Sequence, residues 1–250
     1  MVGHRSLFFT FADGTMTDTP LLDSVPAPAS QRVPEQGLSP RAQRSRNKLK
    51  AAAVACINRM GFRDLRVQDI TVEAGVASGL FYRYFEDLNA IVIEITSDMF
   101  GELVDSFDQV SGRQSRFDWM VQVHEIALGT FGENPGILAC LFGKSDDENS
   151  FSQIWNINAH AWNVKVSDQL MTWGIGPRTR AQALSFVLGA ITEGLIYQGL
   201  VRRTSDLIEM TGGTVTGLAE LIATVWHRAI FLADPPADAT RANRLLSAEA

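Results

Sequence analysis

The sequence predicts an all-α protein in two domains, and three observations support this fold class. Apolar residues recur at helical spacing from about residue 41 to residue 232, whereas no stretch of useful length alternates as a β-strand does. Glycine and proline divide this pattern into segments of helical length. Basic residues gather early, since residues 41–85 carry nine Lys or Arg and three Asp or Glu, a net charge of +6 in a chain of net charge -6.

The composition is that of a folded, soluble protein, with 20% charged and 46% hydrophobic residues. Residues 86–250 carry a net charge of -10 and residues 1–40 one of -2. We therefore expect only the basic segment to meet a polyanion such as DNA. Cys56 and Cys140 lie among apolar neighbours, and we interpret them as reduced core residues of a cytoplasmic protein.

The domain boundaries follow from changes in composition. Residues 1–40 contain five prolines and show no helical period, so we expect a disordered tail there and leave open whether Met1 or Met16 is the start. We place a DNA-binding domain at 41–86, a larger helical domain at 87–233 and a flexible C-terminal tail at 234–250.

The first helix is expected over residues 41–60 and ends at Gly61. One of its faces is apolar through Leu49, Ala53 and Ile57. Its first turns carry a basic cluster formed by Arg41, Arg44, Arg46, Lys48 and Lys50. Positive charge is unfavourable near a helix N-terminus, so the cluster indicates contact with an external anion such as DNA phosphate.

Residues 67–85, VQDITVEAGVASGLFYRYF, predict two short helices joined by a tight turn. The first helix stops at Gly75, where a left-handed backbone costs least, and Ser78 is placed to cap the second. Phe81 and Phe85 share one face of the second helix and are expected to be core. Two helices joined in this way form a helix-turn-helix, whose second helix fits the DNA major groove.

Further helices are expected over 88–107, with Asp87 as cap, and over 116–132, 137–142 and 151–173. Residues 179–201 are apolar on almost all sides. Glu193 and Gln198 favour a helix covered by a partner subunit over a membrane span, because charge inside a span is costly. The last helix is expected over 214–232, after a break at the TGG of 211–213.

The run GFRDLRVQDITVEAGVASGLFYRYFEDLNAI, preceded by LKAAAVACINRM, resembles the TetR family of bacterial transcriptional regulators. The shared pattern is Gly-Phe at 61–62, Asp-Ile at 69–70, Gly-Val at 75–76 and the aromatic end of the recognition helix at 81–85. The match covers roughly residues 42–100. The resemblance implies a homodimer that pairs through helices 179–201 and 214–232. It further implies a repressor that binds a palindromic double-stranded DNA operator and is released by a mainly hydrophobic small-molecule effector held in domain 87–233.

The resemblance and the helix positions together give the expected DNA-contacting residues: Arg44, Arg46, Lys48, Arg66, Gln68, Ser78, Gly79, Leu80, Tyr82, Arg83, Tyr84 and Asn89. Leu88 departs from the family pattern, because many members have a phosphate-binding lysine there, and the contact is lost or moved to Asn89. Leu80 stands where threonine or serine is frequent and suits a thymine methyl group. If the basic cluster compensates, operator affinity depends steeply on salt.

For the effector we expect a pocket among Trp119, His124, Phe131, Trp155, Asn158, His160 and Trp162, each of which a packed core also explains. His124 and His160 form no metal-binding spacing, so we expect neither a metal nor another cofactor.

Two other functions stay open. One is a dimeric DNA-binding regulator without a small-molecule effector. The other is an all-helical enzyme or carrier that retains a helix-turn-helix. No activated nucleophile, phosphate-cradling glycine loop or acid/base pair can be located, so we do not expect an enzyme.

Overall fold

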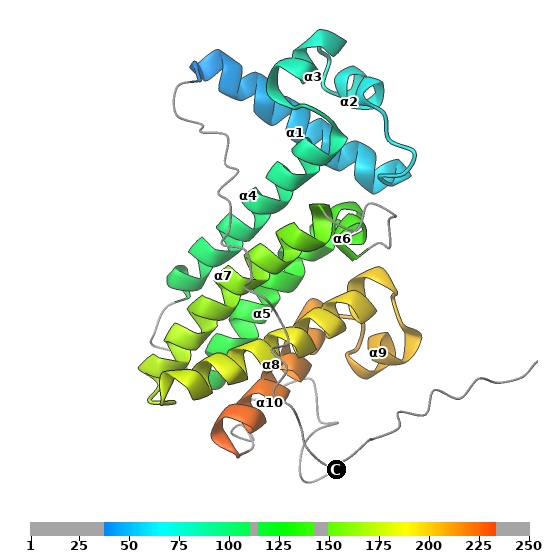
Figure 1. Cartoon of the computed structure of the whole chain (residues 1–250). Helices are drawn as coiled ribbons and strands as arrows, with labels where there is room; N and C mark the ends of the chain where they lie inside the picture. Colours follow the sequence, from blue (N-terminus) through cyan, green and yellow to red (C-terminus); the bar gives the residue numbers. More distant parts are fainter. Residues whose placement is uncertain (1–37, 111–114, 143–149, 234–250) are drawn as a thin grey trace, which may run out of the picture. The chain divides into compact units, whose positions relative to one another are not determined.

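The computed structural model describes residues 38–110, 115–142 and 150–233, and every regular element in these ranges is a helix (Figure 1). The expected all-α fold class is confirmed. The C-terminal tail at 234–250, and the N-terminal tail up to residue 37, lie outside the described residues.

The N-terminal helices are α1 (Pro40–Met60), α2 (Val67–Glu73) and α3 (Ser78–Tyr84), and α4 (Leu88–Gln109) follows them. α1 begins where Ser39 caps it, since the Ser39 hydroxyl accepts a hydrogen bond from the backbone N–H of Ala42 at 3.3 Å. It ends at Gly61, whose φ of 79° suits glycine. α4 begins with the expected cap, because the Asp87 carboxylate accepts from the Ala90 N–H at 2.8 Å.

The remaining helices are α5 (Arg116–Glu133), α6 (Pro135–Phe142), α7 (Ser150–Thr172), α8 (Arg178–Ile196), the π-helix η1 (Tyr197–Val201), α9 (Ser205–Met210) and α10 (Val215–Phe231). The expected helix over 179–201 is thus divided into regular α8 and the wider turn η1. The predicted break at 211–213 is confirmed. Gly212 and Gly213 have φ values of 64° and 66°, and the Thr214 hydroxyl caps α10 by accepting from the Gly217 N–H at 2.9 Å.

α10 packs along α5, and α7 packs against both α4 and α8. Between α5 and α10, α5 buries Met120 and Leu128, and α10 buries Ile222 and Trp226. The first helix is joined to the later ones at two places, since α1 contacts both α4 and α6. Through these contacts α1 connects the N-terminal helices to the later ones.

α8 and η1 together, Arg178–Val201, are long and apolar enough to cross a membrane by length and composition, and no other helix among the described residues is. Only 22% of this apolar window is buried within the chain. Phe186 and Val187 are the most exposed large apolar side chains on α8, at 69% and 56%. The apolar surface of α8 is therefore largely uncovered in a single chain.

Candidate nucleic-acid interface

The helix-turn-helix is built from α2 and α3. At the start of α2 the Arg66 N–H donates to the Asp69 carboxylate at 2.9 Å. The turn passes through Gly75, whose φ is 62°, and the Val76 N–H donates to the Thr71 carbonyl oxygen at 3.0 Å. These bonds fix the angle at which α3 leaves α2.

One expected cap is wrong. Ala77 occupies the cap position of α3, no side-chain hydrogen bond closes that end, and Ser78 is the first helical residue. The Ser78 hydroxyl instead lies 3.5 Å from the Thr71 hydroxyl of α2. Ser78 and Gly79 are both exposed at the beginning of α3, so they stay available to a partner.

α3 has a buried and an exposed side. Phe81 and Phe85 are buried, which confirms the prediction that they are core. Tyr82 is 63% exposed, and Arg83 beside it is exposed as well. The exposed side of α3 is therefore polar and carries one positive charge.

The remaining candidates differ in exposure. Arg66 and Gln68, around the start of α2, are exposed. Leu80 and Tyr84 of α3 are half-buried, and Tyr84 packs against the core. Asn89, in the first turn of α4, is half-buried too. The side chain of Gln68 is thus open to solvent, while those of Leu80, Tyr84 and Asn89 are only partly exposed.

The basic cluster of α1 is divided between two faces, and this corrects the expectation for Arg46. Arg46 is 3% exposed and forms an ion pair with Glu94 of α4. Its guanidinium carbon lies 5.6 Å from the centre of the Phe85 ring. Because its charge is already paired inside the protein, we no longer assign Arg46 to the DNA-contacting set.

Lys50 also faces α4, one turn after Arg46. Its ammonium lies 3.0 Å from the second carboxylate oxygen of Glu94 and pairs with Asp98 as well. Burial of Lys50 opposes its charge, but the hydrogen bonds to Asp98 and Glu94 outweigh this effect, and its pKa is raised. Two of the five basic residues therefore hold α1 on α4.

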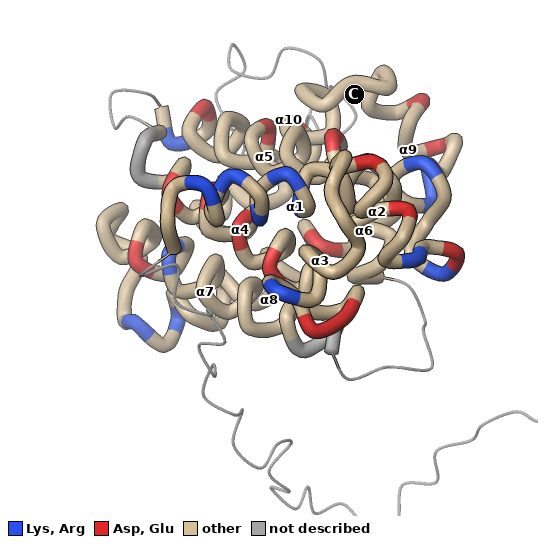
Figure 2. Tube along the Cα trace, turned by 90° about the horizontal axis from the view of Figure 1, so that it is seen from above, with Lys and Arg blue, Asp and Glu red and all other residues tan. Residues whose placement is uncertain are grey.

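The other three basic residues, Arg41, Arg44 and Lys48, lie on one exposed face of α1 at spacings of three and four residues, and we call them the outer basic row. Basic positions recur along α1 in the view of Figure 2. The outer basic row and the exposed side of α3 are the surfaces that remain free to bind phosphate groups.

The residues expected to line the effector pocket either pack into the core or face solvent, and whether they bind an effector stays a prediction. Trp119 is buried edge-to-face against Phe107 and Trp173, with ring centres 4.7 and 5.1 Å away. Trp162 meets the same Phe107 ring at 5.3 Å. Trp155 lies 5.9 Å from Phe131 in a second aromatic group.

The polar members of that set have other roles. Asn158 is half-buried and donates to the Ile154 carbonyl oxygen of its own helix at 2.9 Å, and His160 is exposed. His124 is fully buried and hydrogen-bonds through Nδ1 to the Met120 carbonyl oxygen at 2.6 Å. Burial lowers the pKa of His124 to about 4, so its ring is neutral at pH 7.

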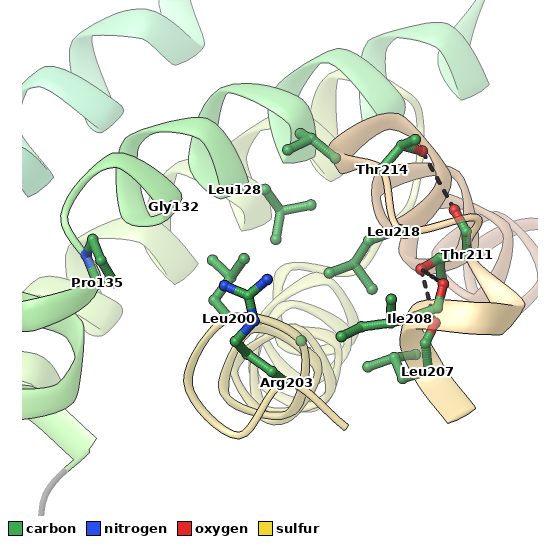
Figure 3. A pocket seen from close by; sticks show the side chains of 13 residues that line it. Leu128, Gly132, Pro135, Leu200, Arg203, Leu207, Ile208, Thr211, Thr214 and Leu218 are labelled. Carbon is green, nitrogen blue, oxygen red and sulfur yellow. Dashed lines mark hydrogen bonds between the residues drawn. The ribbon is translucent and has the colours of Figure 1, made fainter. Parts of the chain in front are cut away.

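A pocket of about 200 Å³ lies elsewhere, between the α5–α6 turn, η1, α9 and the start of α10 (Figure 3). It includes none of the seven residues expected from the sequence. Its lining residues are Leu128, Gly132, Pro135, Gly199, Leu200, Arg203, Leu207, Ile208, Thr211, Gly213, Thr214, Val215 and Leu218. The feature of the sequence that lies nearest to it is the TGG at 211–213, which predicts a break in the helix pattern and not a cavity.

The described residues contain no group of three His, Cys, Asp or Glu side chains placed to hold a metal ion.

Comparison with known proteins agrees with the helix-turn-helix assignment. Residues 49–95 match the family model described as bacterial regulatory proteins, tetR family. The chain is 25% identical over 202 residues to the HTH-type transcriptional regulator BetI of Escherichia coli K12, which covers 80% of this chain and 89% of BetI.

Solved structures share the fold of about three-quarters of the chain. A tetR-family transcriptional regulator from Streptomyces coelicolor superposes with a TM-score of 0.59 at 18% identity, over 78% of this chain and 91% of that one. A regulator assigned to the same family from Syntrophomonas wolfei gives a TM-score of 0.61 at 13% identity, over 76% of this chain and 96% of that one. With the match at 49–95, the helix-turn-helix on α2 and α3 and this shared fold, the chain belongs to the TetR family of DNA-binding transcriptional regulators.

Proposed function

We propose that this regulator is a cytoplasmic repressor that acts as a homodimer on a palindromic operator and is released by a small-molecule effector. The observation that carries the DNA-binding part is the two-sided character of α3. Its apolar side chains Phe81 and Phe85 are buried, while Tyr82 and Arg83 are exposed. A short helix that exposes a phenol and a guanidinium beside a helix-turn-helix junction is suited to the major groove.

Within this proposal the residues divide by chemistry. Gln68 has the donor and acceptor pair that suits an adenine edge, and the partly exposed Leu80 suits a thymine methyl group. Arg66, Tyr82, Arg83 and the outer basic row contact phosphates, with smaller contributions from Ser78, Gly79, Tyr84 and Asn89.

The dimer is supported by the exposed apolar surface of α8. That surface includes Phe186, Val187 and Ile191, and all three side chains are exposed to solvent. Exposed apolar groups that recur along one helix are typical of an interface with another chain. α10 buries Leu218, Ile222, Trp226 and Ile230 within the chain and exposes Val215 at its start. We therefore place α8 at the centre of the interface and α10 at its margin.

A DNA mobility-shift assay with the region upstream of the chain's own gene tests the proposal. We expect binding by the wild-type chain, and footprints on two half-sites about one helical turn apart. Tyr82→Ala and Arg83→Gln should each weaken binding about tenfold, since each removes one phosphate contact from each of the two half-sites.

Arg202→Gln is the matched control, because it removes the same charge from an exposed position in the C-terminal domain. Operator affinity of this variant should equal that of wild type. Equal affinity of the Arg83→Gln variant and wild type would exclude α3 as the recognition helix.

A further inference from the structure

The walls of the pocket in Figure 3 are apolar and come from four parts of the chain. Leu128 belongs to α5, Leu200 to η1, Ile208 to α9 and Leu218 to α10. Gly132 and Pro135, at the α5–α6 turn, complete one end. The volume of about 200 Å³ lies below the range of about 300–1,000 Å³ that is usual for drug-sized ligands, so an occupant must be small.

Arg203 supplies the only charged side chain of the lining. In Figure 3 its guanidinium lies between Leu200 and the other apolar walls and points into the space that they enclose. Among the described residues, no acceptor forms a hydrogen bond or ion pair with Arg203. Arg203 is an exposed residue, so its guanidinium borders the pocket on the solvent side, and an arginine beside apolar walls without an internal partner is suited to bind an anion that enters from solvent.

The backbone holds Arg203 in this place at some cost. Its φ is 50°, in the left-handed region that residues other than glycine rarely adopt. The residues on either side are fixed, because the Arg202 N–H donates to the Tyr197 carbonyl oxygen at 2.9 Å and the Thr204 N–H donates to that of Gln198 at 3.0 Å. Strain that the surrounding bonds maintain is characteristic of functional positions.

The two hydroxyls in the lining do not compete with Arg203 as donors. Thr211 donates its hydroxyl proton to the Leu207 carbonyl oxygen at 2.8 Å. The Thr214 hydroxyl donates to the Thr211 carbonyl oxygen at 3.3 Å and accepts from Gly217. Recognition of a polar group therefore depends on the guanidinium, whose two parallel N–H donors match a carboxylate.

The end of the pocket formed by the α5–α6 turn also contacts α1. The Gly136 N–H, next to Pro135 of the lining, donates to Asn58 Oδ1 of α1 at 2.8 Å. Asn58 Nδ2 in turn donates to the Glu133 carbonyl oxygen at 3.5 Å. The approach is close, since a Cβ atom at Gly136 would lie 2.7 Å from Asn58 Oδ1. A ligand that displaces this turn must also disturb its contact with α1.

We propose that this pocket binds a short-chain carboxylate, with the carboxylate on Arg203 and the alkyl chain against Leu128, Leu200 and Leu218. Binding displaces the α5–α6 turn and, through Asn58, alters how α1 carries the helix-turn-helix. The regulatory half of this inference rests on the proposed function, whereas the binding half does not.

Titration calorimetry on the full chain tests the binding half with hexanoate, hexan-1-ol and acetate. Hexanoate should bind at least tenfold more tightly than either of the other two, because only hexanoate has both the anion and the apolar chain. Absence of hexanoate binding, or equal binding of acetate or hexan-1-ol, overturns the proposed site.

Arg203→Gln should lose at least tenfold in hexanoate affinity, and Arg202→Gln should keep wild-type affinity. Arg203→Gly is a second variant that is expected to fold well, since glycine accepts the positive φ without strain. It too should lose hexanoate affinity. Wild-type affinity in both Arg203 variants overturns the role of the guanidinium.

A shift assay with added hexanoate tests the regulatory half. Hexanoate should release the wild-type operator complex, while the Asn58→Ala variant binds hexanoate normally and releases DNA at higher concentrations. If hexanoate binds but leaves the wild-type complex intact, the regulatory half is wrong and the site stands. If the chain binds no operator DNA at all, the proposed function fails, and calorimetry still decides the site.

Discussion

Arg46 of α1 and Glu94 of α4 form an ion pair in which the arginine side chain is 3% exposed. The same guanidinium lies over the ring of Phe85, the residue that follows α3. Nε and Nη1 of Arg46 are buried and have no hydrogen-bond partner among the described residues. The pairing with Glu94 therefore neutralises a charge that the surrounding structure does not otherwise satisfy.

Glu94→Gln should destabilise the protein by about 3 kcal/mol, the lower end of the range for breaking a buried ion pair, because it leaves Arg46 charged and buried. Asp98→Asn removes a carboxylate that is 47% exposed and should cost less than about 1 kcal/mol. Urea unfolding at one fixed protein concentration measures both losses. Equal losses in the two variants would contradict the importance of burial at Arg46.

The outer basic row gives a second prediction. Arg44→Gln and Lys48→Gln should each reduce the slope of log affinity against log salt by about two, because each removes one phosphate contact from each protomer of the proposed dimer. Neither change should alter the free energy of unfolding by more than about 0.5 kcal/mol, since both side chains are exposed. Fluorescence anisotropy at several salt concentrations measures the slope. An unchanged slope in the double variant would remove the outer basic row from the DNA interface.

The division of the basic cluster shows where sequence reasoning ends. Helical spacing predicts that Arg41, Arg44 and Lys48 share one face and that Arg46 and Lys50 share another. Helical spacing does not predict which face meets α4, because that depends on how α1 packs on α4. The paired residues Arg46 and Glu94 are 48 positions apart in the chain. Glu94 and Asp98 lie one turn apart on α4, in the acidic part of the sequence. Their ion pairs with Arg46 and Lys50 determine which face of α1 packs on α4.

The helices themselves were largely predictable, because their ends carry local signals. Ser39, Gly61, Asp87 and the glycines at 212–213 act through bonds to residues at most five positions away. The pocket is the opposite case. Its lining comes from α5, η1, α9 and α10, and Arg203 follows directly after Arg202, so nothing in the sequence distinguishes the arginine of the pocket from the one beside it.

Aromatic content alone does not locate an effector pocket, for a related reason. Large rings are typical of ligand pockets and of cores alike. In this fold Trp119, Trp155 and Trp162 pair edge-to-face with neighbouring rings and fill the space between the helices. Only the three-dimensional packing separates the two uses.

His124 gives a prediction for pH. Its pKa is lowered from 6.5 to about 4 in the folded chain because it is buried. Between these values the unfolded chain binds a proton at His124 that the folded chain does not bind, so stability falls as the pH is lowered through this window. The full effect is about 3 kcal/mol below pH 4, at about 1.4 kcal/mol per pKa unit.

Comparison of the free energy of urea unfolding at about pH 7 and about pH 4.5 measures this contribution. His124→Gln lacks the titrating ring and should lose part of the wild-type pH dependence, whatever its stability at neutral pH. His160→Gln changes an exposed histidine and should keep that dependence. The same pH dependence in wild type and the His124→Gln variant would show that His124 is not buried as a neutral ring.

The exposed surface of α8 gives the last prediction. Phe186 is 69% exposed and lies next to Val187, on a helix of which little is buried within one chain. Phe186→Glu should shift the chain from dimer to monomer, because a carboxylate in an apolar interface loses hydration without gaining a partner. Val72→Glu is the control, since Val72 is 72% exposed on α2, far from α8 in sequence. Light scattering after size-exclusion chromatography should find a dimer for wild type and the control, and a monomer for Phe186→Glu.

Operator affinity should fall in the Phe186→Glu variant as well, because a monomer gains the contacts of one half-site only. A dimeric Phe186→Glu variant would move the interface away from α8.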